Sequence, residues 1–250
     1  MSFAKNAALC AFLAIAAIAL TLYARAQVTD RELAIGNATT LRLNVSGSIH
    51  VIPVSGLTSI KFHVVDNGPS IPPMSVSTSR SGARLDVSIN GPSQNILPFS
   101  GASGYELQLQ YPANIHLDLR QTSGRIHVDS VPASMQLYNA EGDIVVDGAA
   151  ARVTAYASAG DISVMNARTS LTLTAGTGNV TATLAPGWRG SLVRLEASNG
   201  NLHLNVPAGF KAHYDLTTAS GHVSNALRNL ASGPLIFMLT EQGDVSIGTV

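Results

Sequence analysis

The chain has 250 residues, of which 12% are charged, 5% are aromatic and 22 are glycine, and its 15 basic and 15 acidic residues cancel to a formal net charge of zero. This composition excludes a disordered chain, a coiled coil and a nucleic-acid binder with a basic stripe. The length suits one or two ordinary domains. The neutral balance gives no reason to expect a nucleic acid or another anionic polymer as partner.

Residues 1–26 have the features of a secretory signal peptide. Lys5 supplies the positive start, Ala7 to Leu22 is an apolar run of 16 residues, and Ala24-Arg25-Ala26 is a small-x-small cleavage site. The apolar run is shorter than the roughly 20 residues that span a membrane. We therefore expect a mature chain that begins at Gln27, has no membrane span and is exported to the periplasm or the cell surface.

The one cysteine, Cys10, lies within this leader, so the mature protein is expected to contain no disulfide. Without Lys5 and Arg25, 13 basic residues face 15 acidic ones, which gives a net charge of −2. An exported domain of this kind depends on its buried apolar core for stability. Its sequence should therefore show extensive, regular burial.

Residues 27–115 carry strand patterns that are short and irregularly spaced. The Gly, Pro and Ser-rich stretches at 67–73 and 91–103 are typical of loops. Ser46–Val51 (SGSIHV) carries the signature of the repeats described next, so it is compatible with the beginning of the same stack. We expect the segment to form an irregular β cap that protects the open edge of a solenoid. Strands are predicted at Leu41–Val45, Ser48–Val54, Ser59–Val65, Met74–Thr78, Arg84–Ile89 and Tyr105–Tyr111.

From residue 116 to the end, a glycine followed by alternating residues recurs at a fixed phase, as in EGDIVV, AGDISV and QGDVSI. A period near 20 residues indicates a repeat architecture, and a glycine at one phase of every turn suits a tight corner. The repeat glycines are Gly124, Gly142, Gly160, Gly178, Gly200, Gly221 and Gly243, at separations of 18, 18, 18, 22, 21 and 22 residues.

Alignment on these glycines predicts which side chains face inward. The residues two and four positions after the glycine, and five and seven positions before it, are almost all aliphatic, whereas the residues between them are mostly polar. Alternation with a period of two places the aliphatic side chains on one face of each strand. In the coil around Gly160, for example, this alignment places Ile162 inward and Thr154 outward.

Two short strands per turn cannot bury an apolar face alone, whereas stacked successive turns can. β-Branched residues dominate and no helical period of 3.6 is present, which excludes a helical repeat. The sequence therefore predicts an all-β fold. Residues 116–250 are expected to form a parallel β-solenoid of about seven two-strand coils, roughly 30 Å long at a coil spacing of about 4.8 Å, with the irregular N-terminal cap in front.

Three of the later corners are long: Pro186–Gly190, Pro207–Lys211 and Arg228–Pro234. Insertions in repeat proteins map to loops on one face, which is often a binding face. Trp188 and Phe210 lie in these corners. We expect them to cover the edge of the core, with ligand stacking as the alternative.

The run from Ser123 to Ile247, with its recurring Gly-Asp/Asn-Ile/Val units, resembles the bacterial "putative adhesin" family of exported domains of unknown function. Tyr111–Leu119 (YPANIHLDL) is similar to that family's proline-containing turn before the first repeat strand. The resemblance implies a β-solenoid at or near the cell envelope. It carries no catalytic residue over to this chain.

The outward position directly after each glycine is often acidic. Neighbouring coils put Asp143 and Asp161 about 4.8 Å apart, a spacing that would suit the two carboxylates of a retaining glycoside hydrolase or a Ca²⁺ site. However, Arg125 stands one coil from Asp143, and His222 stands one coil from Asp244. The nonapeptide calcium motif is also absent, so a charge-matched structural ladder is favoured.

Seven histidines suggest a metal site at first sight. His50, His127 and His203 share one outward phase, three residues after a glycine. Four coils separate His127 from His203, roughly 19 Å, which is too far for one ion with bonds near 2 Å. We interpret the histidines as solvated and expect no metal, no cofactor and no catalytic residues. No nucleophile elbow, P-loop or dinucleotide fingerprint occurs.

The outward faces are rich in threonine, and Tyr138 and Tyr156 occupy the same outward phase on neighbouring turns. Such a flat array suits binding of a glycan, a protein partner or ice, although Thr and Tyr also simply favour strands. The candidate surface-binding residues are Asp143, Asp161, Tyr138, Tyr156 and Trp188.

Two functions from different classes follow. The first is a non-enzymatic exported envelope protein, an adhesin-like or scaffold module that presents a flat surface to a glycan or an envelope or surface protein. The second is a carbohydrate-active β-helix enzyme, a glycan hydrolase or lyase. An acidic cluster unmatched by cations would favour the enzyme, and this chain offers only a weak one.

Overall fold

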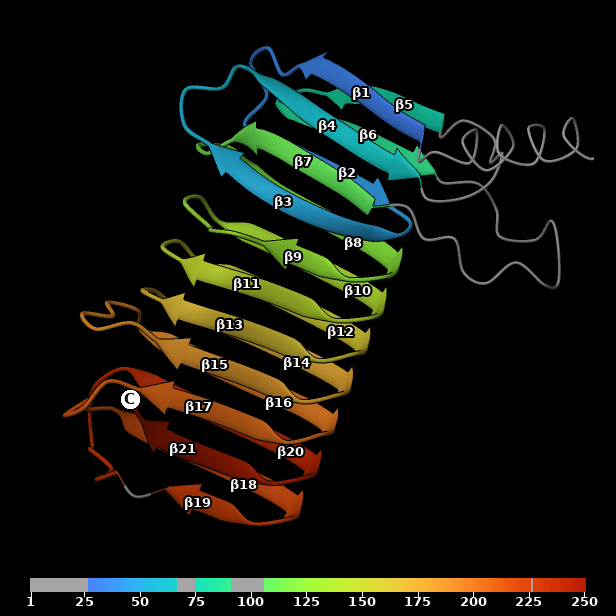
Figure 1. The fold of residues 1–250 in the computed structure, drawn as a ribbon. Coiled ribbons are helices and arrows are strands. Elements are labelled where there is room, and N and C mark those ends of the chain that lie inside the picture. Colours follow the sequence, from blue (N-terminus) through green and yellow to red (C-terminus); the bar gives the residue numbers. More distant parts are fainter. Residues whose placement is uncertain (1–26, 67–74, 91–105, 226) are drawn as a thin grey trace, which may run out of the picture.

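The computed structural model describes residues 27–66, 75–90, 106–225 and 227–250 (Figure 1). The predicted signal peptide lies outside these residues. The described chain forms two long β-sheets, an 11-stranded sheet A and a 10-stranded sheet B, which face each other across one apolar core. No helix among the described residues is long and apolar enough to cross a membrane.

Each repeat coil contributes one strand to sheet B and the next strand to sheet A, and strands of neighbouring coils pair in parallel. This confirms the predicted parallel β-solenoid. Its repeat strands are β8 (His116–Ser123), β9 (Ile126–Val128), β10 (Met135–Glu141), β11 (Ile144–Ala149), β12 (Val153–Ala159), β13 (Ile162–Ala167), β14 (Leu171–Thr177), β15 (Val180–Leu184), β16 (Leu192–Asn199), β17 (Leu202–Val206), β18 (His213–Ser220), β19 (Val223–Asn225), β20 (Leu235–Gln242) and β21 (Val245–Thr249).

The repeat glycine stands at the corner between the two strands of a coil. Gly160 has φ +144°, a conformation that favours glycine. A Cβ atom on Gly160 would collide with the backbone carbonyl of Gly142 in the preceding coil. Glycine therefore recurs once per coil because the backbones of neighbouring coils approach too closely at this corner for a side chain to fit.

The predicted inward residues are buried in every repeat coil except the one formed by β18 and β19. Ile162, for example, is 1% exposed, and it pairs with Ile144 and Val180 on the neighbouring coils. The position three residues before the glycine also faces inward, which the alignment missed. It holds alanine in the middle of the stack and the buried polar side chains of Gln121, Asn139 and Thr240 nearer the ends.

The last two coils do not stack in chain order. Strand β20 lies between β16 and β18, and β21 lies between β17 and β19, so the coil of β18 and β19 ends the solenoid. Successive stacking is thus wrong at this end. A physical reason lies in the inward positions: Asn225 stands where the other repeat coils carry an apolar residue, so this coil offers less apolar surface to a second neighbour. The less apolar coil takes the position with only one neighbour.

The expected division at residue 115 does not separate two packing units. Strands β2 (Thr40–Val45) and β3 (Ser48–Val54) pair in parallel with β8 and β9. Strands β6 (Arg84–Asn90) and β7 (Glu106–Pro112) pair in parallel with β2 and β3. The N-terminal segment therefore adds two coils to the stack, again out of chain order.

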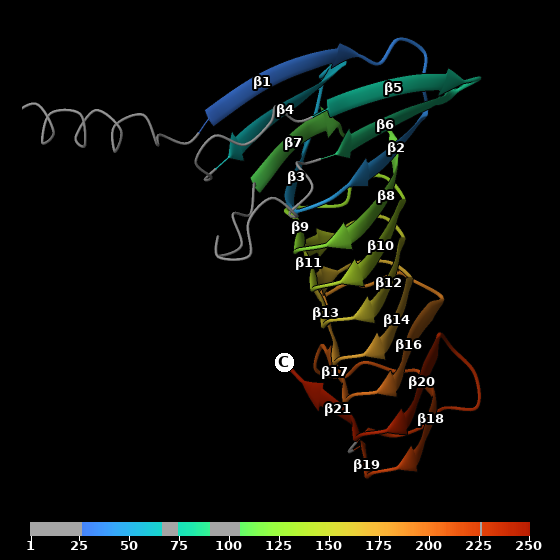
Figure 2. The same ribbon diagram turned by 90° about the vertical axis from the view of Figure 1, so that its right-hand side faces the viewer.

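Antiparallel strands end the stack beyond β6 and β7. In sheet A, β4 (Ser59–Asp66) pairs with β7 and β1 (Gln27–Ala34) pairs with β4, and in sheet B, β5 (Ser75–Ser81) pairs with β6. Figure 2 shows these strands at the opposite end from β18 and β19. They extend both sheets beyond the parallel coils, so that β1 and β5 are the edge strands at this end, and β1 was not predicted.

Candidate functional site

The acidic and amide residues after the repeat glycines form a hydrogen-bonded ladder along the corners. The Oδ1 atom of Asp143 accepts a hydrogen bond from the backbone N–H of Asp161 at 3.1 Å. Asp161 Oδ1 in turn accepts from the N–H of Asn179 at 2.7 Å. The ladder continues from Asn179 to Asn201, from Asn201 to Asp244 and from Asp244 to His222.

The contacts of Asp143 and Asp161 bear on whether these residues form a catalytic carboxylate pair or a structural ladder. Asp143 also forms an ion pair with Arg125, with 3.4 Å between Nη2 and Oδ2. Asp161 accepts a second hydrogen bond, from the side-chain amide of Asn179 at 3.3 Å. Because both carboxylates bond to the backbone of the next coil, the geometry supports the structural ladder rather than a pair of free catalytic carboxylates.

Tyr138 and Tyr156 lie side by side on the outer face of sheet B. Their rings stack with 5.3 Å between centroids and 7° between planes, and each side chain is 40% exposed. In register beside them stand Arg120 on one neighbouring coil and Thr174 on the other. The same face carries Arg194 over the Phe237 ring, 5.1 Å from its centroid.

Arg194 is held by a carboxylate on its own strand. Its Nη2 atom donates to Oε1 of Glu196 at 2.6 Å. This hydrogen bond and the charge of Glu196 raise the pKa of the guanidinium above its usual value. The outer face of sheet B is thus a mixed surface of aromatic rings, hydroxyls and a fixed Arg–Glu pair.

Trp188 packs at the edge of the core. Its indole N–H donates to the carbonyl of Thr169 at 2.7 Å, and its ring meets Phe210 edge-on at 5.6 Å between centroids. Both rings are partly buried against the core. This packing agrees with the expected covering of the core edge. The long corner at 228–234 leads the chain back from β19 to β20.

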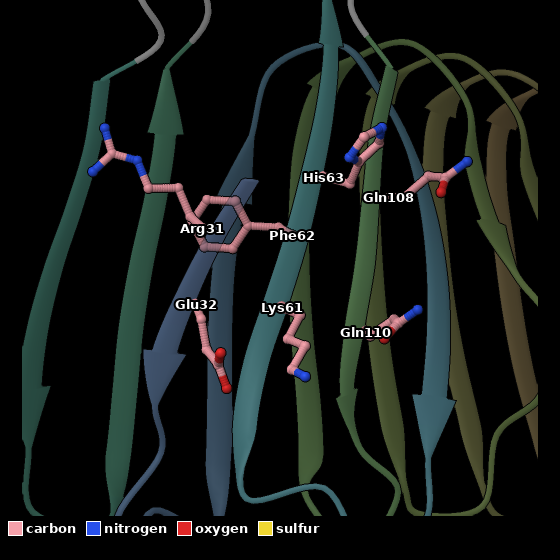
Figure 3. Close-up of a pocket in the computed structure, with 7 residues that line it drawn as sticks. All are labelled: Arg31, Glu32, Lys61, Phe62, His63, Gln108 and Gln110. Carbon is pink, nitrogen blue, oxygen red and sulfur yellow. The ribbon is translucent and has the colours of Figure 1, made fainter. Parts of the chain in front are cut away.

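A groove of about 380 Å³ lies on β1, β4 and β7, near the capped end of sheet A. In Figure 3, His63 and Gln108 lie near one end of the groove, and Glu32, Lys61 and Gln110 near the other. Glu32 and Lys61 are cross-strand partners, and Glu32 accepts a hydrogen bond from the Ser59 hydroxyl. The sequence held no signal for this groove, because β1 and β4 pair antiparallel outside the repeat and their position beside β7 depends on contacts between distant segments.

The structure places His50 directly beside His127. The two residues are register partners on β3 and β9, and their rings stack with 4.7 Å between centroids. Each imidazole also meets a carboxylate: Asp129 for His50 and Asp147 for His127. The expectation of separately solvated histidines is therefore wrong for this pair. His203 lies away from them as expected and bonds to Ser246 and Asn205.

The sequence model of the Toastrack DUF4097 family matches residues 44–249. The match covers most of the chain, including both N-terminal coils except the first residues of β2. The chain belongs to this family. The resemblance to the "putative adhesin" family of unknown function is thereby confirmed, and the matched residues include part of the N-terminal segment that was expected to form a cap.

A comparison with solved structures found matches of low sequence identity that extend over most of this chain. A "putative adhesin" from Bacteroides fragilis is 11% identical with a TM-score of 0.49, over 90% of this chain and 97% of the other. A "putative cell adhesion protein" from Clostridium sporogenes is 10% identical with a TM-score of 0.43, over 90% and 100%. A "putative lipid binding protein" from Parabacteroides distasonis is 10% identical with a TM-score of 0.35, over 90% and 97%. No match was found among curated proteins.

Within the Toastrack domain, the histidine pair was missed although the sequence contained its signal. Ser46–Val51 (SGSIHV) and Ser123–Val128 (SGRIHV) differ at a single position, and each carries histidine at the same phase. Two coils so alike pair readily in register. What the sequence did not show is that β6 and β7 pair with the other edges of β2 and β3, which leaves the coil of β2 and β3 next to the coil of β8 and β9.

Proposed function

We propose that this Toastrack protein is an exported, non-enzymatic module of the bacterial cell envelope, adhesin-like or scaffolding, that binds a glycan or an envelope protein through the outer face of sheet B. The observation that carries the proposal is the exposed, stacked pair of Tyr138 and Tyr156. Among the described residues, they are the exposed residues with a large aromatic ring, each 40% exposed, and they lie next to each other.

The chemistry of this face suits recognition. Tyrosine offers a large apolar surface and a hydroxyl while losing little conformational entropy on binding, which is why it is frequent in binding surfaces. Thr154, Thr172 and Thr174 supply further hydroxyls at neighbouring outward positions. A regular sheet holds all these groups at fixed spacing, so a ligand meets a preorganised surface.

The alternative of a glycan-cleaving enzyme has less support. A retaining glycosidase needs one carboxylate as acid and a second as nucleophile, both open to the substrate. Asp143 and Asp161 instead hold the coil corners together. Binding without turnover is therefore the expected behaviour.

A paired experiment tests this function. The mature protein is screened on a glycan array and against detergent-solubilised envelope proteins, and every glycan that binds is then incubated with the protein and assayed for new reducing ends. Tyr138→Ala/Tyr156→Ala should weaken binding at least tenfold. Met165→Ala is the matched control, because Met165 is 46% exposed on sheet A. New reducing ends, or equal losses in both variants, would overturn the proposal.

Export is tested separately by intact-mass measurement of material secreted by a bacterial host. The proposal expects a chain that begins at Gln27. Retention of residues 1–26 in the exported protein would contradict the predicted cleavage after Ala26.

A further inference from the structure

The outer face of sheet A carries a cluster of four groups that can ligate a metal. His50 and His127 stand in register on β3 and β9, adjacent strands in Figure 1, with their rings 8° from parallel. Because the two imidazoles project from equivalent positions of parallel strands, their Nε2 atoms point the same way. The side chains are 26% and 36% exposed, so solvent reaches both rings.

Two carboxylates lie where these nitrogen atoms point. Asp129 Oδ1 is 2.6 Å from His50 Nε2 and 3.8 Å from His127 Nε2. Asp147 Oδ2, one coil further on, is 2.9 Å from His127 Nε2. The donor atoms of His50, His127 and Asp129 all lie within 4.8 Å of one another.

We propose that His50, His127 and Asp129 bind a divalent transition-metal ion, with Asp147 or water completing the coordination. Ligands at 2.0–2.2 Å from a tetrahedral Zn²⁺ are about 3.3 Å from each other. The donor atoms of His50 and Asp129 must move slightly apart, and the Nε2 atom of His127 must approach Asp129 by about 0.5 Å. The two Nε2 atoms must also converge, because their rings now stack with 4.7 Å between centroids. Tilting of the two rings toward each other brings the nitrogen atoms together, and both side chains are partly exposed, which leaves room for that movement.

The donor set selects a class of metal. Imidazole nitrogen suits Zn²⁺, Cu²⁺ and Ni²⁺, whereas Ca²⁺ and Mg²⁺ prefer sites made of oxygen. Two imidazoles and a carboxylate therefore favour the first group. The ion would replace the contacts of the Nε2 atoms with Asp129 and Asp147, because a metal binds the unprotonated ring nitrogen.

The inference is independent of the proposed function. The metal site lies on the outer face of sheet A, whereas Tyr138 and Tyr156 lie on the outer face of sheet B. Loss of metal binding and loss of glycan or protein binding are thus separate outcomes, measured with different variants.

The chain supplies comparison sites that isolate the effect of the cluster. His203 has the same outward phase on β17, but its ring bonds to Ser246 and Asn205 rather than to a carboxylate. His222 has one carboxylate partner, with 3.6 Å between its Nδ1 and Asp244 Oδ1. Within the described residues, no second imidazole is a hydrogen-bond or stacking partner of His203 or His222.

The experiment uses the untagged mature protein, because a histidine tag would bind the same ions. Calorimetric titrations with ZnCl₂ are run on the wild type and on His50→Gln, His127→Gln, Asp129→Asn and His203→Gln, each checked for an unchanged thermal melt. CaCl₂ and MgCl₂ titrations measure the selectivity. Electron paramagnetic resonance with one equivalent of Cu²⁺ reports whether nitrogen atoms ligate the ion.

We expect one Zn²⁺ per chain, a loss of tenfold or more in affinity in each of the three cluster variants, and wild-type affinity in His203→Gln. The Cu²⁺ spectrum should show nitrogen coupling that disappears in His50→Gln and His127→Gln. The proposal is wrong if the wild type binds no Zn²⁺ saturably, if Ca²⁺ or Mg²⁺ binds as well as Zn²⁺, or if His203→Gln loses as much affinity as His127→Gln.

Discussion

The Oδ1 atom of Asp161 accepts a hydrogen bond from the backbone N–H of Asn179 in the next coil, at 2.7 Å. The same bond recurs from coil to coil along the row of glycine corners. At these corners the strand ladder is interrupted, and a side-chain acceptor satisfies an N–H that the sheet leaves free. The requirement is for an oxygen acceptor on a short side chain, which explains why Asp and Asn interchange along the row.

The first prediction separates this structural role from a catalytic one. Asp161→Asn keeps the acceptor oxygen, so its free energy of unfolding should stay within about 0.5 kcal/mol of the wild type. Asp161→Ala removes the acceptor and should cost about 1 kcal/mol. Urea melts of the two variants measure the difference. Equal destabilisation by both would show that the charge, rather than the hydrogen bond, matters at this position.

The second prediction concerns the close approach at the corners. Gly160→Ala places a methyl group against the Gly142 carbonyl and keeps φ positive, so it should cost about 3 kcal/mol. Gly187→Ala is the matched control, because Gly187 also has a positive φ, +77°, but nothing lies within 4 Å of its added Cβ. That variant should cost about 1 kcal/mol. Thermal melts that rank the two variants in the opposite order would refute the argument.

Most of the solenoid could be predicted from the sequence because each coil repeats the same physical constraints. The alternation of apolar and polar residues around Ile144 and Ile162 predicts one buried face for each strand. The recurring glycine predicts one tight corner in each coil. Both signals are local, so they can be recognised without knowing which coil lies beside which. The strands predicted in the N-terminal segment, such as Ser48–Val54, were likewise confirmed.

The order of the coils could not be predicted, because it depends on contacts between distant segments. Nothing local to Val223 or Asn225 shows that the coil of β20 and β21 inserts between their own coil and that of β16 and β17, although the polar Asn225 at an inward position is compatible with the end of a stack. The same limit hid the pairing of His50 with His127. The candidate metal site exists only because of the out-of-order stacking at the N-terminal end.

The third prediction concerns Tyr111, which is fully buried on β7. Its hydroxyl has no hydrogen-bond partner among the described residues, and burial raises the pKa of the phenol above its usual value of 10.0. Because the folded state favours the neutral phenol, its contribution to stability is complete below pH about 10 and is lost as the pH rises toward the higher folded value.

Tyr111→Phe should therefore leave stability at neutral pH unchanged or increase it by up to about 1 kcal/mol, since it removes an unpartnered polar group. It should also reduce the loss of stability between neutral pH and pH about 11. Some loss remains, because burial also raises the pKa of Tyr214. Urea melts at the two pH values test this, and a strongly destabilised Tyr111→Phe protein would indicate a hydrogen bond that the geometry does not show.

The last prediction tests the facing of the strands. Ile162 is 1% exposed between Ile144 and Val180, whereas Thr154 in the same coil is exposed. Ile162→Asp would bury a carboxylate with no partner, at a cost of several kcal/mol. Typical domains have about 5–15 kcal/mol of total stability, so this variant should fail to fold or melt far below the wild type.

Thr154→Asp is the matched control, because it introduces the same carboxylate eight residues away on the outer face of sheet B. It should change the free energy of unfolding by about 0.5 kcal/mol or less, as is usual for surface substitutions. Denaturant melts of the two variants decide the outcome. If Ile162→Asp is tolerated while Thr154→Asp unfolds the protein, the inward and outward faces are exchanged, and the burial that stabilises the stack has been assigned to the wrong side chains.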